Sequence, residues 1–180
     1  MMRRPAAAVV LALFGWTLTA CTPKPVPILA LAVRDGKPVG VIVTCPRMFT
    51  ILGVREASRK STSPGEPPLA NWAISGMADS DLVEVTLFGA APQGWQVDNN
   101  SGAPVSPGNL DVVLDPLTQL RPGIGYSLHG MARYHSYEVD FTTDDLDRIG
   151  PDQVLGSTDE GTTKLMSRAG FLRAARGHCD

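Results

Sequence analysis

The stretch Leu120-Arg121-Pro122-Gly123-Ile124-Gly125-Tyr126-Ser127-Leu128 decides the fold of this chain. A Pro-Gly pair favours a tight turn, because the proline ring fixes φ at the value that the first central residue of the turn needs, and glycine accepts the positive φ that the next residue can require. The run from Tyr137 to Thr142 alternates apolar and polar side chains, which is typical of a half-buried strand. We therefore expect a turn that leads into a strand, with a second strand close behind it.

The same segment resembles the tyrosine corner of fibronectin type III and related immunoglobulin-like sandwiches, whose pattern is L-x-P-G-x-x-Y. The residues on this pattern are Leu120, Pro122, Gly123 and Tyr126. The resemblance implies a sandwich in which the Tyr126 hydroxyl bonds back to the backbone where the chain crosses between sheets. Antibody-type domains carry a Cys two residues later, where this chain has Leu128, so the broader sandwich class fits better. An ordinary Pro-Gly turn before a strand is the alternative.

The rest of the chain supports a mainly β protein. Its 180 residues include 18 Gly and 15 Pro but only 6% aromatic side chains, a composition that favours many turns between short strands. The formal net charge of −2 is too balanced for a nucleic-acid-binding surface. Short apolar runs bounded by turn residues predict strands at 28–33, 39–45, 48–54, 71–75, 82–88, 94–97 and 111–114. We expect an immunoglobulin- or fibronectin III-like antiparallel sandwich over residues 28–142, with long loops at 57–70 and 99–109.

Residues 143–180 predict a small α+β extension packed on the sandwich. Thr143 is the expected N-cap of a short helix over 144–149, and Val154-Leu155 is expected to pair with Lys164-Leu165-Met166 as a hairpin. Ser167 is the expected cap of a helix over 168–176, with Gly177 just beyond its end. We expect its apolar face to dock on the sandwich through Phe171, Leu172, Ala174 and Ala175.

The N-terminal segment has the pattern of an export signal. Arg3 and Arg4 precede an apolar stretch over 6–18, which is too short for a confident membrane span. The sequence Leu18-Thr19-Ala20-Cys21 resembles the lipobox of bacterial lipoproteins. The resemblance implies that residues 1–20 are removed, that Cys21 receives a diacylglyceryl group, and that 21–27 form a proline-rich tether. A plain secretory signal and an uncleaved anchor are the alternatives, and both the general and the twin-arginine export routes stay open.

Cys45 and Cys179 are left as a pair once Cys21 is set aside for lipidation. An exported protein occupies a compartment that permits disulfides, so we expect the two to be bonded. Two free thiols are the alternative. A zinc site is less consistent with the sequence, because a tetrahedral site usually takes its ligands as two closely spaced pairs, and His178 with Cys179 is a single pair.

Few residues suggest chemistry. The sequence contains no G-x-S-x-G, H-E-x-x-H, P-loop or S-x-x-K motif. His129 and His135 flank an expected hairpin loop and could form a two-histidine metal or proton-relay site, with Glu138 or Asp140 behind them, or simply face solvent. The acidic residues Asp144, Asp145 and Asp147 could bind a hard cation, but a helix start explains them equally well. Trp72 is expected in the core, and Trp95 is the candidate for an exposed binding residue.

We therefore expect a lipid-anchored binding or scaffold module on the outer face of the cytoplasmic membrane. Its expected partners are the membrane, through the lipid on Cys21, and a protein or other cell-envelope component contacted through the loops at 57–70 and 99–109. Neither a cofactor nor nucleic acid is expected, and catalysis is less favoured than binding. The alternative function is a cell-envelope enzyme or metal-binding protein that uses His129 and His135.

Overall fold

Two packed β-sheets carry the fold of the computed structural model, which describes residues 23–57, 70–98 and 115–179. Cys21 and its motif, most of the two long loops and the strand expected at 111–114 lie outside the described residues. The mainly β sandwich with a small C-terminal helix is confirmed.

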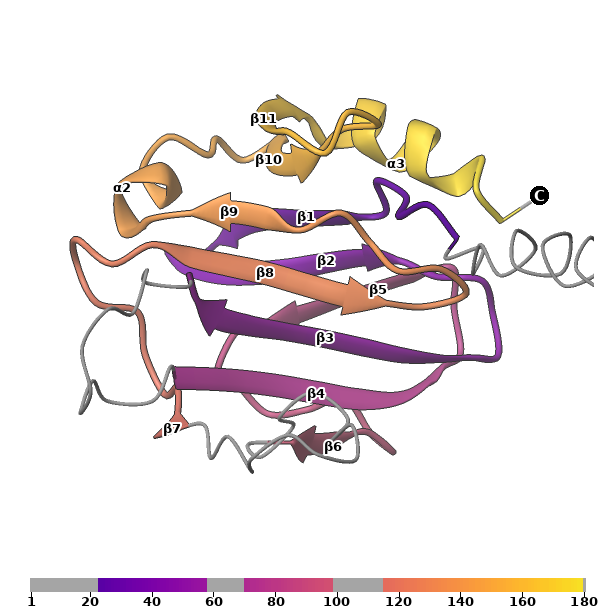
Figure 1. The fold of residues 1–180 in the computed structure, drawn as a ribbon, viewed down its shortest axis with the longest axis horizontal. Coiled ribbons are helices and arrows are strands. Elements are labelled where there is room, and N and C mark those ends of the chain that lie inside the picture. The colour runs from indigo at the N-terminus through magenta and orange to yellow at the C-terminus, as the bar shows by residue number, and fades with distance from the viewer. Residues whose placement is uncertain (1–22, 58–69, 99–114, 180) are drawn as a thin grey trace, which may run out of the picture.

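The first sheet has the strand order β11-β10-β1-β2-β5 (Figure 1). Its strands are β1 (Leu29–Arg34), β2 (Lys37–Val43), β5 (Leu82–Thr86), β10 (Gln153–Ser157) and β11 (Thr163–Ser167), and all neighbours are antiparallel. β1 and β2 form the predicted hairpin, in which Asp35 and Gly36 both adopt a positive φ, as a tight type I′ turn requires. The C-terminal hairpin joins this sheet as a continuation, because β10 pairs with β1.

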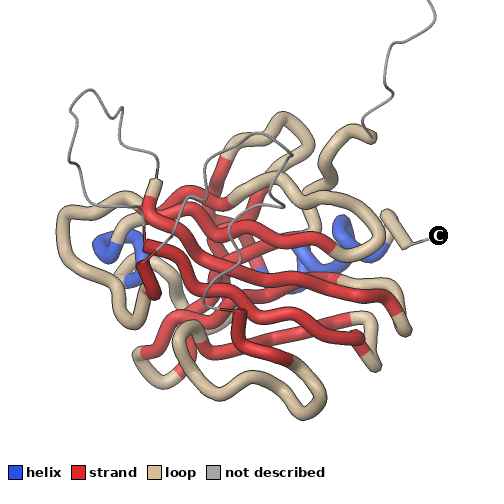
Figure 2. Tube along the Cα trace, turned by 60° about the horizontal axis from the view of Figure 1, so that its bottom comes forward, coloured by secondary structure: helices blue, strands red, loops and turns tan. Residues whose placement is uncertain are grey.

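The second sheet has the order β6-β4-β3-β8-β9, with the short β7 parallel to β4. These strands are β3 (Met48–Glu56), β4 (Ala70–Ala78), β6 (Gln96–Asp98), β7 (Asp115–Pro116), β8 (Tyr126–Met131) and β9 (Val139–Phe141). The orders β1-β2-β5 and β4-β3-β8-β9 correspond to the A-B-E and C′-C-F-G strands of immunoglobulin-like sandwiches. Figure 2 shows the strands running side by side, with loops gathered at both ends.

The core lies between the sheets. Its largest fully buried side chains include Leu29, Leu31 and Ile42 from the first sheet and Leu52, Ile74 and Leu128 from the second. Close approach of the sheets depends on Gly40, where a Cβ would come within 2.9 Å of Leu52 Cδ2. Side chains alternate across each strand, so every second residue of the second sheet points away from this core.

The corner segment is a turn ahead of β8. Tyr126 is fully buried, and its hydroxyl accepts a hydrogen bond from the Arg121 backbone N–H at 2.8 Å. Gly123 has φ +76°, a conformation that favours glycine. The Arg121 guanidinium forms an ion pair with Glu56, whose side chain is only 5% exposed. The hydrogen bond to Glu56, and a smaller one with Tyr126, raise the pKa of Arg121.

The helices lie close to their predicted positions, with three corrections. α2 (Thr143–Leu146) starts one residue earlier than expected, with Thr142 as its N-cap, because the Asp145 carboxylate accepts the Thr142 backbone N–H at 2.9 Å. It also ends three residues earlier than expected, with Asp147 as its C-cap. α3 (Arg168–Arg176) has the expected Ser167 cap, which accepts from the Gly170 N–H at 3.2 Å. Its buried face is Phe171, Leu172 and Ala175, whereas Ala174 is exposed, because it lies on the opposite side of the helix from the sheet.

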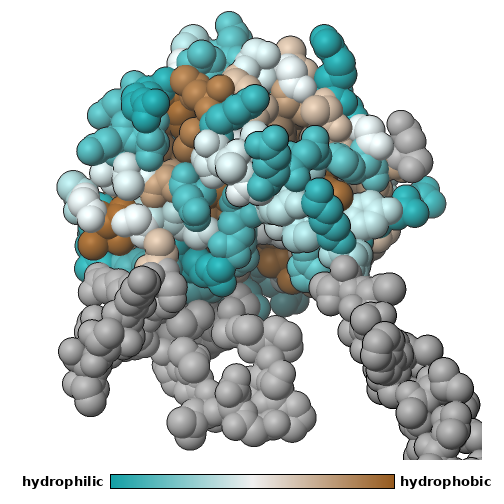
Figure 3. All heavy atoms as spheres, turned by 45° about the horizontal axis from the view of Figure 1, so that its top comes forward, coloured by the Kyte–Doolittle hydropathy of each residue, from teal (hydrophilic) through white to brown (hydrophobic). Residues whose placement is uncertain are grey.

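α3 covers the outer face of the first sheet, where Phe171 packs over Gly156 of β10. The predicted disulfide is present: Cys45 after β2 is bonded to Cys179 after α3, with their Cα atoms 5.6 Å apart. Ion pairs from Arg168 to Glu84 and from Arg176 to Asp81 also hold the helix on the sheet. Hydrophilic residues dominate this side of the molecule, with smaller apolar areas between them (Figure 3).

Candidate functional site

The outer face of the second sheet, meaning the side of β4, β3, β8 and β9 turned away from the first sheet, is the candidate site. It is turned toward the viewer in Figure 1, and no helix of the described residues crosses it. Functional groups on strands are held more rigidly than groups on loops, so this face presents its side chains in fixed positions.

A cluster of four polar residues lies on the half of this face nearest the corner. The register places Arg55 of β3 opposite Ser127 of β8, and Ser127 opposite Asp140 of β9. Arg55 forms an ion pair with Glu138 at 2.5 Å, and the buried Ser127 Oγ lies 2.5 Å from a Glu138 oxygen and 2.9 Å from an Asp140 oxygen. We call Arg55, Ser127, Glu138 and Asp140 the polar cluster.

His129 lies beside the polar cluster, over the backbone of β3. The register pairs it with Gly53, where a Cβ would come within 2.7 Å of the imidazole Nε2. Glycine at position 53 therefore leaves the space that the His129 ring occupies. The His129 Nδ1 is buried and has no hydrogen-bond partner in the described structure.

Two pKa shifts characterise this face. Burial lowers the pKa of His129, and the positive charge of Arg55 lowers it further against a smaller opposing effect of Glu138, so the fold favours the neutral imidazole. Burial raises the pKa of Glu138, but hydrogen bonds from Ser127 and Arg55 and the charge of Arg55 outweigh it and leave the pKa below its usual value. Glu138 is therefore ionised and weakly basic.

Ser127 is not arranged as an activated nucleophile. A serine nucleophile needs a base that accepts its proton and a third group that orients the base. Here the Ser127 hydroxyl is held by two carboxylates, and the depressed pKa of Glu138 makes it a poor proton acceptor. His129 is not oriented by a partner on Nδ1 within the described structure.

His135 is not part of this constellation. It is exposed in the loop after β8, where it forms an isolated bridge with Met131, while His129 points over Gly53. Among the described residues, no group of three or more His, Cys, Asp or Glu side chains is arranged to hold a metal ion. The structure brings His129 near Glu138, as the sequence suggested, and places His135 opposite Met131 at the end of the same strand.

Trp95 is half-buried and is used for packing. Its indole covers Gly76 of β4, where a Cβ would come within 2.5 Å of the ring, and its N–H donates to the Met77 carbonyl at 3.2 Å. Trp72 is buried in the core and packs edge-on against Phe88 at 5.5 Å between ring centroids. In α2, Asp145 serves the helix cap and pairs with Arg148, so a structural use accounts for it.

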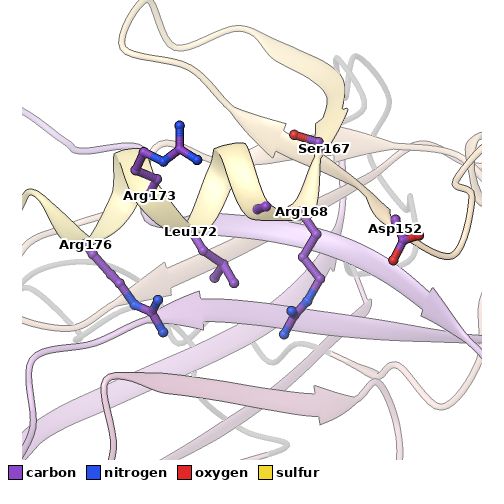
Figure 4. Close-up of a pocket in the computed structure, with 7 residues that line it drawn as sticks. Asp152, Ser167, Arg168, Leu172, Arg173 and Arg176 are labelled. Carbon is purple, nitrogen blue, oxygen red and sulfur yellow. The ribbon is translucent and has the colours of Figure 1, made fainter.

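A groove along α3 is a hollow among the described residues. It encloses about 680 Å³ and is lined by Asp152, Ser167, Arg168, Ala169, Leu172, Arg173 and Arg176. Figure 4 shows Arg168 and Arg176 extending toward the strands on either side of Leu172. Because these two arginines already pair with Glu84 and Asp81, the groove has less unmatched charge than its arginine content suggests.

Sequence reasoning missed Arg55 and Ser127. The available signal was alternation: residues 53, 55, 127 and 129 are the positions of two strands that face away from the apolar positions 52, 54 and 128. Comparison of the chain with protein-family models, with curated proteins and with solved structures gives no match.

Proposed function

We propose that this chain is a lipid-anchored, extracytoplasmic binding module that acts without catalysis on the outer face of the cytoplasmic membrane. The lipobox-like motif ending at Cys21 supports the anchor. The Cys45–Cys179 bond supports an oxidising compartment, because disulfides persist outside the cytoplasm and are rare within it. In the described residues, no helix is long and apolar enough to cross a bilayer.

The polar cluster is the observation that carries the binding role. Arg55 and Glu138 keep 49% and 41% of their side-chain surface exposed while they are paired with each other, and Ser127 behind them is buried. A partner would therefore meet a donor and an acceptor already held in place, which reduces the entropy cost of ordering them on binding. The loops at 57–70 and 99–109 remain part of the proposal as additional contacts, although most of both lies outside the described residues.

The cluster's chemistry sets the class of partner. A guanidinium and a carboxylate side by side recognise a surface that offers both an acceptor and a donor, as a folded protein or a peptide backbone does. We therefore propose a protein partner in the cell envelope. The alternative is an enzyme or metal-binding protein that uses His129 and His135, and no observation on the polar cluster specifically favours it, since the bridge places His135 opposite Met131 and not opposite a residue of the cluster.

The anchor is tested by metabolic labelling with a fatty-acid precursor. The wild-type protein should carry label and fractionate with membranes, whereas Cys21→Ala should carry none. Label that persists on Cys21→Ala would contradict lipidation at this residue.

The binding role is tested by crosslinking the anchored protein in intact cells and comparing the captured partners of two variants. Arg55→Ala removes the exposed cation of the polar cluster, and Arg148→Ala removes a more exposed arginine that pairs with Asp145 of α2. A specific partner should be lost with Arg55→Ala and kept with Arg148→Ala. Equal capture by both variants would exclude the polar cluster as the binding surface.

A further inference from the structure

The tether enters the sandwich at the loop between β8 and β9. Val26 donates its N–H to the His135 carbonyl at 2.9 Å and accepts the Tyr137 N–H at 3.1 Å, so it is bonded into that loop from both sides. Cys21 lies five residues before Val26. A fully extended chain covers at most about 3.5 Å per residue, so Cys21 lies within roughly 17 Å of this loop.

The same end of the molecule carries the most exposed large apolar side chains of the second sheet. Phe49 of β3 and Met77 of β4 are directly paired across the strands on the outer face and are 50% and 51% exposed. Ile51 and Met131 form the next pair along the same face. We call Phe49, Ile51, Met77 and Met131 the apolar end patch.

The patch and the tether are neighbours in the sheet. His135 in the tether-binding loop is bridged to Met131, and Met131 is paired with Ile51. Tyr134, at the tip of that loop, lies under the Arg133 guanidinium at 5.5 Å from its ring centre. Tyrosine, phenylalanine and arginine stems are side chains that settle at the boundary between headgroups and acyl chains.

We infer that the apolar end patch and the tip of the β8–β9 loop rest on the lipid bilayer to which the chain is anchored. This inference rests on the proposed lipid anchor. A body held within about 17 Å of the bilayer experiences a high effective concentration of lipid surface, so a contact too weak to hold the free protein is populated once it is tethered.

Charge does not drive this contact. Arg47 and Arg133 at the tether end stand against Asp79 in the β4–β5 turn, where Asp81 is already paired with Arg176. This small excess of positive charge is not a polybasic surface. The contact should therefore form on uncharged lipid and should be insensitive to salt, in contrast to the binding of a polybasic surface.

The orientation is tested with a tryptophan reporter on tethered protein. The protein used starts at residue 22, which keeps every described residue, and carries an N-terminal histidine tag. It is bound through this tag to phosphatidylcholine vesicles that contain a nickel-chelating lipid and brominated acyl chains. Phe49→Trp places the reporter in the patch, and Met77→Trp repeats it on the neighbouring strand. Asp147→Trp places a matched reporter on the exposed C-cap of α2, at the opposite end. Native Trp72 and Trp95 contribute the same background to all three.

We expect bromine to quench the two patch reporters at least about twofold more than the Asp147→Trp reporter, at low and high salt alike. Equal quenching at both ends would overturn the inference, and so would sedimentation showing a dimer that Phe49→Glu abolishes, because a second copy would then cover the patch. The chelating lipid replaces the acyl group, so failure of lipid labelling at Cys21 and failure of this orientation are separate results.

Discussion

Replacing Tyr126 by Phe removes one hydroxyl from the centre of the corner and leaves the ring in place. The ring is fully buried and packs against Phe141 at 5.6 Å between centroids, and these contacts survive the change. What is lost is the 2.8 Å hydrogen bond from the Arg121 N–H. A typical internal hydrogen bond contributes about 0.5–1.5 kcal/mol to stability, so we expect a loss in this range.

The size of the loss in stability depends on whether the Arg121 N–H finds another acceptor once the hydroxyl is gone. This residue lies in an exposed turn, where water can partly replace the hydroxyl, so we expect a value nearer about 0.5–1 kcal/mol than the upper limit. In a chain of this size, 1 kcal/mol lowers the melting temperature by about 2–4 °C.

Urea unfolding of the oxidised protein measures the effect as a lower midpoint at an unchanged slope. Tyr134→Phe is the matched control, because Tyr134 is partly exposed and its ring serves the contact with Arg133. If both substitutions are equally neutral, the Tyr126 hydroxyl does not stabilise the corner and the reasoning from the L-x-P-G-x-x-Y pattern fails.

Three further predictions concern the disulfide, the imidazole and the tryptophan. Reduction of Cys45–Cys179, which are 134 residues apart, should cost up to about 5 kcal/mol in the chain-entropy model, whereas ready alkylation of both thiols in unreduced protein would contradict the bond. The pKa of His129 is lower in the folded protein than in the unfolded chain, so on acidification the unfolded chain binds a proton at this imidazole first. The free energy of unfolding should therefore fall as the pH drops through about 6.5, and the same fall in His129→Gln would refute this. Gly76→Ala should cost about 1–3 kcal/mol by displacing Trp95, and a much smaller cost in a Trp95→Ala background would show that the two residues are coupled.

Features with a local cause could be predicted from the sequence. The Asp35-Gly36 hairpin, the Ser167 cap of α3 and the turn at Gly123 each follow from the conformational preference of one or two residues. The cap of α2 was placed one residue late because two successive threonines precede the acidic turn. Only the contact from Asp145 back to the Thr142 N–H decides between them.

The candidate site depends on strand register, which is a non-local property. Arg55 and Ser127 are 72 positions apart in the chain, and they become neighbours only because β3 pairs with β8 in one particular register. The expectation of a two-histidine site used sequence proximity instead. His129 lies in the regular part of the sheet over Gly53, and His135 lies in the exposed loop opposite Met131, so the two-histidine site stays a prediction.

The two sheets differ in what their outer faces require, and the difference is visible in their strands. β2 is apolar from Val39 to Val43 with Gly40 as its one small residue, so both of its faces need cover, and α3 supplies it on the outside. The end of β3 near the corner instead alternates, placing Leu52 and Val54 in the core and Gly53 and Arg55 outside. A strand end with a charged outer side chain can be stable in contact with water. This alternation is therefore the physical reason why the half of the second sheet that carries the polar cluster can stay uncovered, whereas the half that carries Phe49 and Ile51 is the part we propose to rest on lipid.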